Sequence, residues 1–194
     1  VLAHLQPLLG IHWGTRDSLA MVSNRAQLPR FGAAVQDAVS SNTPVALVGI
    51  DLDFFKTVND SYGHAAGDEV LREFGRRLRQ RFGDPALITR PGGEEFTIVW
   101  IGATLGEVIE SLSAFLLEQE RVAYAAIERP NTCSLGVGLF PQFVSRVGDD
   151  TLAALQRVAD DAVYASKSAG RNRLRWGTDR SPIDGREHLD QDAA

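Results

Sequence analysis

The chain has 194 residues, of which 44% are hydrophobic and 23% charged, with a formal net charge of −5 at pH 7. This length and composition indicate one full-sized globular domain with tails, and the acidic balance argues against a protein that binds nucleic acid or anionic membranes. The single cysteine, Cys133, excludes an internal disulfide framework, and no apolar run approaches the roughly 18–20 residues that cross a bilayer.

The ends of the chain differ from its centre. Because the chain begins at Val1 without Met, we expect a piece of a longer protein, in which residues 1–15 form a linker or the end of an upstream signalling helix. The folded domain is expected over residues 16–176, and the polar residues 177–194 are expected to be a disordered tail. No signal peptide is visible. We therefore expect a cytoplasmic domain. This expectation includes the case in which the domain is one part of a membrane-bound or multidomain protein with an upstream sensory domain.

Apolar periodicity predicts the main elements in chain order. Helices are predicted at about 27–40, 68–81, 105–118 and 151–168. Strands are predicted at 45–50, 87–90, 96–100, 122–128, 131–140 and 174–176. Helices alternate with strands, and hairpins also occur, so we expect a mixed α/β (α+β) domain in which helices flank a central mixed sheet.

Three segments carry further expectations. Residues 59–68 are rich in Gly and short polar side chains and are predicted to form a loop. Gly136 and Gly138 indicate a close approach or a bulge within their strand. One face of the predicted helix 68–81 carries a row of arginines that is more typical of a solvated surface than of a binding site. These are Arg72, Arg76, Arg77 and Arg79.

Two acidic stretches are predicted to meet at one edge of the sheet. Asp51 and Asp53 follow the buried strand 45–50, and Glu94 and Glu95 follow a tight Gly-Gly turn in the predicted hairpin. If the strands are neighbours, these carboxylates crowd together and need cations between them. An oxygen-only ligand set without Cys or His suits Mg²⁺, which binds a few carboxylates plus substrate phosphates. An ordinary solvated turn is the alternative for Glu94 and Glu95.

Three blocks of sequence together resemble the GGDEF domain, the catalytic domain of diguanylate cyclases. The signature stands as Gly92-Gly93-Glu94-Glu95-Phe96, the GGEEF variant. The pattern D-x-D-x-F-K-x-x-N-D-x-x-G-H-x-x-G-D runs from Asp51 to Asp68, and A-D-x-A-x-Y-x-A-K-x-x-G-R-N runs from Ala159 to Asn172. The resemblance covers about residues 17–173 and implies the palm-like fold of nucleotidyl cyclases.

The resemblance implies a reaction and its cofactor. Members condense two GTP molecules into cyclic di-GMP and release two pyrophosphates, by metal-assisted attack of a 3′-hydroxyl on an α-phosphate across a homodimer. Two Mg²⁺ ions per active site are implied, or Mn²⁺ in their place. Asp51, the backbone carbonyl of Leu52 and Glu94 are similar to the metal ligands. Glu94 also resembles the general base, and Glu95 the support of the second cation.

The resemblance also implies contacts to the triphosphate of the substrate. Lys56 is similar to a catalytic lysine that offsets charge in the transition state. The backbone N–H groups of Phe54, Phe55 and Lys56 are expected to cradle phosphates, while the two rings are expected to pack in the core. Lys167 and Arg171 match the contacts to the γ-phosphate. Without the other blocks, both would be interpreted as cations favoured at the end of a helix.

Recognition of the base is implied for two further residues. Asn59 and Asp68 resemble the readers of guanine. Asp68 can accept hydrogen bonds from the N1–H and the 2-amino group of guanine, and adenine has a donor at neither position. A helix N-cap is the alternative role for Asp68. His64 resembles a residue on the substrate side, and a histidine that packs in the loop is the equal alternative.

The chain departs from the family pattern at the inhibitory product site, R-x-x-D. Gly83 and Ala86 occupy those positions, and Arg81 and Asp84 form the motif two residues out of register. The interpretation that no inhibitory site exists is therefore favoured. Glu110 replaces the arginine that often completes the site, and its charge would repel a dinucleotide.

Two other functions remain as alternatives. A catalytically weak GGDEF module could act as a regulatory domain that binds GTP or cyclic di-GMP, although the intact signature favours the enzyme. A relative of polymerases or adenylyl cyclases is disfavoured by the pair of guanine readers.

Overall fold

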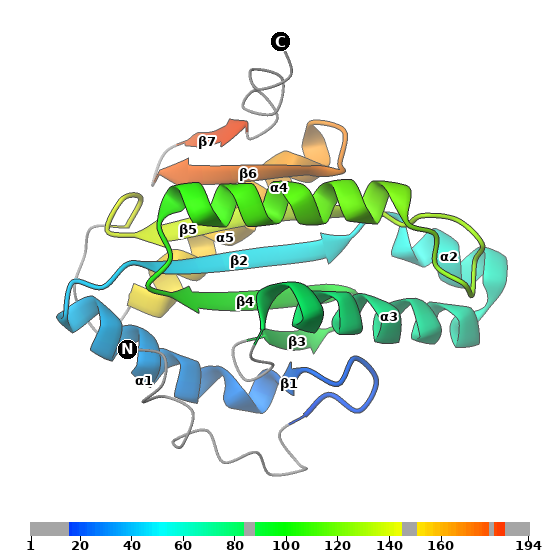
Figure 1. The fold of residues 1–194 in the computed structure, drawn as a ribbon, viewed down its shortest axis with the longest axis horizontal. Coiled ribbons are helices and arrows are strands. Elements are labelled where there is room, and N and C mark those ends of the chain that lie inside the picture. Colours follow the sequence, from blue (N-terminus) through cyan, green and yellow to red (C-terminus); the bar gives the residue numbers. More distant parts are fainter. Residues whose placement is uncertain (1–15, 84–87, 145–150, 179–180, 185–194) are drawn as a thin grey trace.

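The computed structural model describes residues 16–83, 88–144, 151–178 and 181–184. A seven-stranded mixed sheet with the order β1-β3-β4-β2-β5-β6-β7 forms its centre (Figure 1). Its strands are β1 (Ser23–Asn24), β2 (Val45–Leu52), β3 (Ile88–Gly92), β4 (Glu95–Ile101), β5 (Cys133–Phe140), β6 (Arg173–Thr178) and β7 (Ser181–Asp184). Pairs β1–β3 and β5–β6 are parallel and the others antiparallel. The predicted mixed sheet is confirmed.

Strand β2 lies at the centre of this sheet. All eight of its residues are buried, and it pairs antiparallel with β4 on one side and β5 on the other. An apolar run without alternation is expected for a strand covered on both faces. The strand continues two residues past the predicted end at Ile50, so Asp51 and Leu52 still belong to the sheet.

Helices cover both faces of the sheet. They are α1 (Leu28–Ser40), α2 (Phe55–Tyr62), α3 (His64–Phe82), α4 (Leu105–Arg121) and α5 (Thr151–Ser168), with a short 3₁₀ helix at Arg25–Gln27. In Figure 1, α3 and α4 lie in front of the sheet and α5 lies behind it. Helix α1 packs against α5, and α2 lies beyond the end of β2 (Figure 1).

Glycines in β5 allow α5 to lie close to the sheet. A Cβ atom at Gly136 would stand 2.1 Å from the carbonyl oxygen of Ala159, and one at Gly138 would stand 2.5 Å from that of Leu155. No side chain fits at those distances. The predicted close approach is confirmed, and it lets α5 pack directly on the backbone of β5.

The predicted loop 59–68 is instead helical. Helix α2 continues to Tyr62 and α3 begins at His64, so Gly63, with φ of 82°, is the only break. The two helices then cross closely, because a Cβ at Gly67 would lie 2.0 Å from Oδ1 of Asn59. The Gly-rich composition reflects this break and this crossing rather than a loop.

The predicted strand 122–128 is wrong, because this segment turns back on itself. The N–H of Tyr124 donates to the carbonyl of Arg129 (2.9 Å), that of Ile127 donates to the carbonyl of Tyr124 (3.1 Å), and Glu128 has φ of 51°. Tyr124 and Ile127 are both buried in the core. Buried apolar anchors separated by polar residues produced a pattern that resembles a strand.

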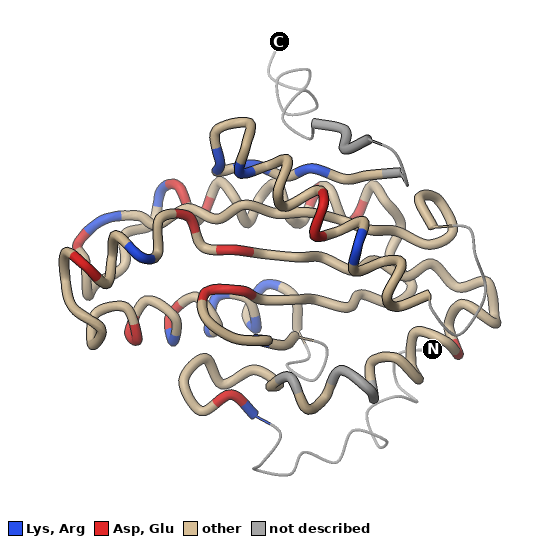
Figure 2. The backbone as a smooth tube through the Cα atoms, turned by 180° about the vertical axis from the view of Figure 1, so that it is seen from behind, with Lys and Arg blue, Asp and Glu red and all other residues tan. Residues whose placement is uncertain are grey.

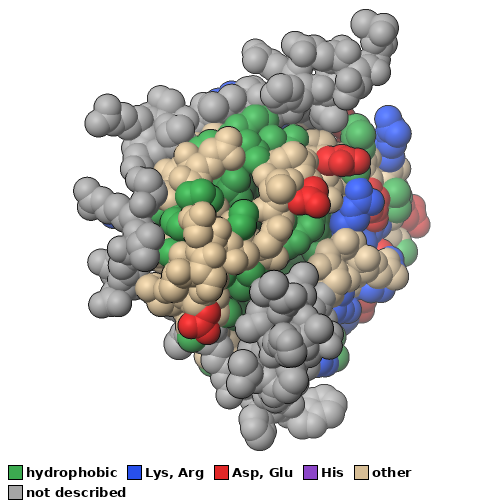
Figure 3. Space-filling model, turned by 60° about the vertical axis from the view of Figure 1, so that its left-hand side comes forward, with side chains coloured by type: hydrophobic (Ala, Val, Ile, Leu, Met, Phe, Trp, Pro, Cys, Tyr) green, Lys and Arg blue, Asp and Glu red, His purple; other side chains and the backbone are tan. Residues whose placement is uncertain are grey.

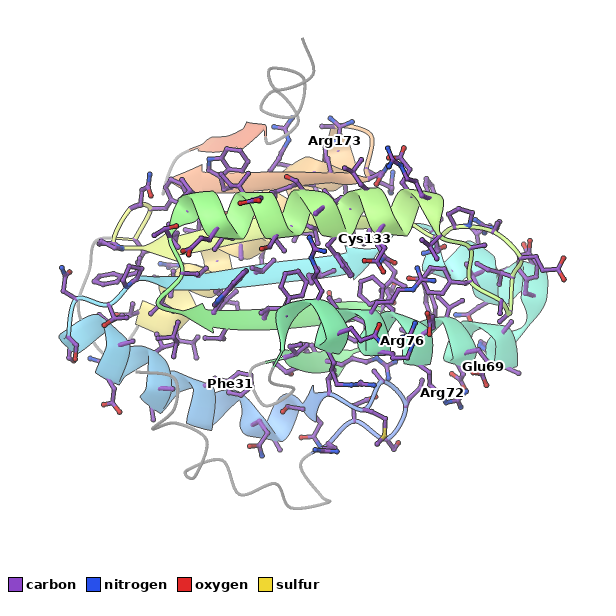
Figure 4. All side chains as sticks on the ribbon, in the orientation of Figure 1. Phe31, Glu69, Arg72, Arg76, Cys133 and Arg173 are labelled. Atoms are coloured by element: carbon purple, nitrogen blue, oxygen red, sulfur yellow. The ribbon has the colours of Figure 1, made fainter. Side chains whose placement is uncertain are left out.

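The arginines of α3 differ in their surroundings. Arg72 and Arg76 are exposed and pair with Glu69 and Glu73 respectively. Figure 4 shows Arg72 close to Glu69 on α3. Figure 3 shows such charged side chains of both signs together at the right of the view. For these two arginines, the predicted solvated surface is confirmed.

Arg77 does not belong to that surface. It is 3% exposed, donates to Oε1 of Gln119 (3.2 Å) and to the carbonyls of Val122 and Ala123 (3.3 and 3.2 Å), and pairs with Glu73 (2.9 Å). Its guanidinium carbon also lies 4.1 Å from the centre of the Tyr124 ring. Arg77 therefore ties α3 to the segment after α4, and the prediction that it is solvated is wrong.

The C-terminal side of the domain is longer than predicted. Strand β6 reaches Thr178, and β7 pairs with it antiparallel, so the expected disordered tail does not hold for residues 177–178 and 181–184. Residues 1–15 and 185–194 lie outside the described part of the chain. Cys133 is a free, buried cysteine of β5 (Figure 4). Within the described ranges, no helix has the length and apolar character to span a membrane.

Candidate active site

The end of β2 lies beside the β3–β4 turn. Asp51 is the register partner of Glu95, and the N–H of Leu52 donates to the carbonyl of Glu94 (3.3 Å). Seen from behind in Figure 2, the acidic segments of β2 and of this turn are neighbours. The predicted juxtaposition of Asp51 with Glu94 and Glu95 is therefore present in the fold. Asp51 is buried, Glu94 half-buried and Glu95 exposed.

An arginine that the sequence analysis did not single out supports the turn. Gly93 has φ of 55°, and Arg90 donates to its carbonyl through Nε (2.8 Å) and Nη2 (2.6 Å). The third nitrogen, Nη1, lies 3.1 Å from Oδ2 of Asp17. Asp17 in turn accepts the N–H groups of Leu19 and Ala20. The acidic turn is thus braced from the segment that opens the domain.

A lysine from α5 pairs with Asp51. Nζ of Lys167 lies 2.7 Å from Oδ2 of Asp51. Burial raises the pKa of Asp51, the Lys167 ammonium opposes that rise, and the charges of Glu94 and Glu95 add to it. A buried carboxylate surrounded by acids is stabilised by a cation, and the last turn of a helix is a favourable place for one.

A pocket of about 300 Å³ opens between the sheet and α5 at this point. Asp51, Glu95 and Lys167 line it together with Asp160 and Tyr164 of α5. The pKa of Asp160 is raised, first by burial and then by Glu95. Asp160 and Tyr164 belong to the closing block of the sequence motif, yet the sequence analysis gave them no role. The structure places them at the pocket.

The donor set at this edge fits a hard cation. Among the described residues, no group of three or more His, Cys, Asp and Glu side chains is arranged to hold a metal ion. Asp51 and the acidic turn instead offer carboxylates from one side, and an ammonium already lies against Asp51. Such an open set of oxygen ligands suits Mg²⁺. This ion usually completes its coordination with substrate phosphates and is rarely enclosed by protein ligands alone.

Asp53 differs from the other three acids. It is 2% exposed, and its carboxylate accepts hydrogen bonds from Oγ1 of Thr132 (2.8 Å), Oγ of Ser134 (2.7 Å) and the backbone N–H of Asn172 (2.9 Å). These donors already satisfy much of its capacity as an acceptor. The expectation that Asp53 shares cations with its neighbours is therefore corrected.

The link between β2 and α2 carries two different aromatic residues. Phe55 is 7% exposed and packs in the core as predicted, whereas Phe54 is 61% exposed with φ of 55°. The guanidinium carbon of Arg171 lies 4.7 Å from the centre of the Phe54 ring. The prediction of core packing is wrong for Phe54, because its left-handed backbone turns the ring outward. Lys56 is exposed and pairs with Asp60 (2.9 Å).

The residues predicted to read the base come from α2 and α3. Asn59 lies against Gly67, the residue that precedes Asp68 in α3. Because α3 begins at His64 and Gly63 is its N-cap, Asp68 lies in the second turn and is not the cap. His64 is exposed, which does not support the alternative of packing.

The predicted inhibitory motif is only partly within the described chain. Arg81 is exposed in the last turn of α3, and Glu110 is exposed on α4. Asp84 and Ala86 lie outside the described residues. The doubtful register of this motif therefore stays an expectation from the sequence.

Comparison with known proteins gives a consistent result. A family model described as diguanylate cyclase, GGDEF domain, matches residues 15–173. The chain is 31% identical over 188 residues to the diguanylate cyclase TpbB of Pseudomonas aeruginosa, covering 94% of this chain and 42% of TpbB. It is 34% identical over 161 residues to the cyclic di-GMP phosphodiesterase PdeR of Escherichia coli, covering 81% of this chain and 23% of PdeR. The chain thus spans less than half of each of these two relatives.

A solved structure shows the same fold. The crystal structure of the GGDEF domain of DgcB from Caulobacter crescentus in complex with c-di-GMP matches with a TM-score of 0.74 at 27% identity. The match covers 86% of this chain and 94% of that one. The palm-like fold predicted from the sequence motifs is confirmed.

Proposed function

Because this chain belongs to the GGDEF family of diguanylate cyclase domains, we propose that it condenses two GTP molecules into cyclic di-GMP and releases two pyrophosphates. One observation carries the proposal: buried Asp51 lies beside the Glu94-Glu95 turn, with Lys167 of α5 on its carboxylate. Acids that bind cations and a cation that contacts phosphate are thus gathered at one edge of the sheet. This is the combination that phosphoryl transfer requires.

The acids of this edge have distinct proposed roles. Asp51, the carbonyl of Leu52 and Glu94 would hold one Mg²⁺ or Mn²⁺ ion, and Glu95 would support a second. Such ions, when bound, neutralise the triphosphate and lower the pKa of the attacking 3′-hydroxyl. Glu94 accepts the proton of that hydroxyl as general base. Its position on a braced turn next to β2 supports this role, because a base must be held within hydrogen-bond reach of its proton.

The triphosphate is proposed to lie along the start of α2 and the end of α5. Phe54, the N-cap of α2, makes no side-chain capping hydrogen bond, which leaves the first N–H groups of the helix to bind phosphate oxygens. Lys167 of α5 pairs with Asp51, and Arg171, in the turn after α5, lies over the Phe54 ring, which supports a role for both at the same triphosphate. Lys56, now paired with Asp60, would contact the phosphates as charge develops on them.

The base is proposed to bind between α2 and α3. Asn59 lies against Gly67, the residue before Asp68, where the two helices cross, and this supports a shared role. Asp68 would accept from the N1–H and the amine of guanine. Adenine has no donor at either position, so its binding would leave the carboxylate unpaired.

We propose that the active form is a homodimer. One domain carries one such site, and each product molecule contains two phosphodiester bonds formed from two GTP molecules. Two sites must therefore face each other. Specific activity should fall on dilution, in parallel with dissociation measured by analytical ultracentrifugation, and full activity in a strictly monomeric sample would contradict this.

A regulatory role is the second candidate. The match to PdeR, a protein named as a phosphodiesterase, favours it, because a GGDEF-type segment there belongs to a protein with a different named activity. Such a module would bind GTP or cyclic di-GMP without turnover.

One assay separates the two candidates. The protein is incubated with GTP and Mg²⁺, and cyclic di-GMP is quantified by mass spectrometry. We expect product from the wild-type protein, a loss of about 10²–10⁴-fold in Glu94→Gln, as for removal of a general base, and no change in Glu110→Gln, an exposed glutamate of α4. Binding of GTP without product would instead support the regulatory module.

A further inference from the structure

Asp53 is a buried acid that the proposed reaction does not use. It lies two residues after Asp51 at the end of β2, and it is 2% exposed. Its carboxylate is held by three neutral donors: the hydroxyls of Thr132 and Ser134 and the backbone N–H of Asn172. Burial of a charged group is costly unless hydrogen bonds replace its hydration. The three hydrogen bonds of Asp53 therefore indicate a structural role for this buried carboxylate.

Two of the three donors come from the start of β5 and the residue just before it. Ser134 lies on β5 and Thr132 just before it. The N–H of Asp53 also donates to the carbonyl of Thr132 (2.9 Å), and Nδ2 of Asn131 donates to the carbonyl of Asp53 (3.3 Å). These contacts fasten the end of β2 to the start of β5. Asp53 is thus held in place through both its backbone and its side chain.

The third donor comes from a turn that is costly to form. After α5, both Arg171 and Asn172 have left-handed backbones, with φ of 63° and 45°. Each such residue that is not glycine costs on the order of 1 kcal/mol and persists only where its surroundings hold it. The N–H of Asn172 donates to Asp53 (2.9 Å), and that of Arg171 donates to the carbonyl of Ser166 (3.0 Å).

This turn sets the direction of Arg171. Its guanidinium lies over the exposed ring of Phe54, on the link that opens α2. Lys167, one helical turn earlier, pairs with Asp51. Two acids at the end of β2 thus hold this region at two points: Asp51 pairs with the side chain of Lys167 on α5, and Asp53, just past the strand, accepts the backbone N–H of Asn172 in the turn after α5.

We propose that Asp53 is a positioning residue: its buried carboxylate fixes the Arg171–Asn172 turn and thereby holds the Arg171 guanidinium at the triphosphate site. The proposal rests on the proposed function, because it is that function which makes Arg171 a phosphate contact. The carboxylate itself touches neither nucleotide nor metal. Its effect on binding passes through Arg171.

A double-mutant cycle tests this, with 3′-deoxy-GTP as the probe. This nucleotide keeps the triphosphate and the base but lacks the attacking hydroxyl, so binding is measured without turnover. Asp53→Asn retains one acceptor oxygen but presents an NH₂ group to donors, so the three hydrogen bonds cannot all form. We expect the variant to bind 3′-deoxy-GTP with Mg²⁺ about tenfold more weakly, as expected for loss of one charged contact.

The double variant decides between positioning and general damage. If Asp53 acts through Arg171, Asp53→Asn combined with Arg171→Ala binds no more weakly than Arg171→Ala alone. Ser134→Ala is the matched control, because it removes a donor to the same carboxylate from the sheet side. It should lower the melting temperature and leave the affinity within about twofold. Additive losses in the double variant, or an equal loss in Ser134→Ala, would overturn the proposal.

Hydrogen exchange gives a second readout that needs no variant. The amide of Asn172 should be protected in the wild-type protein, because its N–H is bonded to a buried acceptor. Exchange at the rate of an open loop would overturn the proposal even if Asp53→Asn fails to fold. If the wild-type protein does not bind 3′-deoxy-GTP while this amide is protected, the proposed function fails and the hold of Asp53 on the turn still stands.

Discussion

The ammonium of Lys167 lies 2.7 Å from the carboxylate of Asp51, so a cation from α5 lies on the buried acid at the end of β2. This pair offsets only part of the rise in the pKa of Asp51, which burial causes first and the charges of Glu94 and Glu95 increase. The ionised form of Asp51 is therefore unfavourable without a further cation, as is common where charges are arranged for function rather than for stability.

Replacing Asp51 should stabilise the metal-free domain. A carboxyl group whose pKa is higher in the folded state binds its proton more tightly there. The free energy of unfolding therefore falls as the pH rises from 3.8, the ordinary pKa of the group, through its raised pKa in the folded state. Above that window the ionised carboxylate opposes folding. Asp51→Asn removes this cost, and we expect a higher free energy of unfolding than the wild type at pH 7, measured by urea titration without metal.

The same comparison at lower pH is the control. Below the ordinary pKa of the carboxyl group both proteins are neutral at this position, so the advantage of Asp51→Asn should vanish. A variant that is less stable at pH 7 would show that the Lys167 pair outweighs the burial.

The brace on the acidic turn should affect substrate binding. Arg90→Met removes both donors to the carbonyl of Gly93, and we expect the KM for GTP to rise about tenfold because the turn that carries Glu94 is less well held. Asp17→Asn leaves both Arg90 donors in place and weakens only the ion pair between Arg90 and residue 17. The rise in the KM for GTP should therefore be smaller in this variant. An effect of Asp17→Asn that equals or exceeds that of Arg90→Met would contradict this account.

Arg77 should contribute far more to stability than its neighbour on α3. Arg77→Met leaves the oxygen of Gln119 and two backbone carbonyls without this buried donor, and we expect a loss of about 3 kcal/mol. Arg76→Met, which removes an exposed ion pair with Glu73, should cost less than about 1 kcal/mol. Chemical denaturation of both variants measures the difference, and equal losses would be the contrary result.

The contact between β5 and α5 should not tolerate a methyl group. Gly136→Ala places a Cβ 2.1 Å from the carbonyl oxygen of Ala159, so α5 must move, and we expect a loss of about 3 kcal/mol or more. Gly106→Ala, in the first turn of α4 where nothing lies within 4 Å, should be neutral or stabilising. Comparable melting temperatures for the two variants would contradict the packing described here.

Much of the fold follows from local patterns in the sequence. The apolar run of β2 and the periodicity of α5 gave the correct elements, because burial on both faces or on one stripe leaves a direct mark. The acidic edge was also predictable, since a carboxylate after a buried strand and two more after a tight turn meet whenever the strands pair. The acids come close because β2 and β4 are neighbouring strands of the sheet.

Contacts between distant segments were not predictable. The sequence groups Asp53 with the acids expected to share cations, and it does not reveal that the partners of this carboxylate, Thr132 and Asn172, lie far along the chain. The spacing of arginines on α3 predicts a solvated row that includes Arg77, and it does not reveal the acceptors of Arg77 in the segment after α4. In both cases a charged side chain is buried among neutral or compensating partners that no local pattern reveals.

The central claim is that Asp51 and the acidic turn hold divalent cations that bind the triphosphate. The most direct test is the affinity for 3′-deoxy-GTP, measured by calorimetry over a series of Mg²⁺ concentrations in the wild type and in Asp51→Asn. We expect the wild-type affinity to rise steeply with Mg²⁺ and that of the variant to remain low and nearly flat. An unchanged Mg²⁺ dependence in Asp51→Asn would contradict the claim.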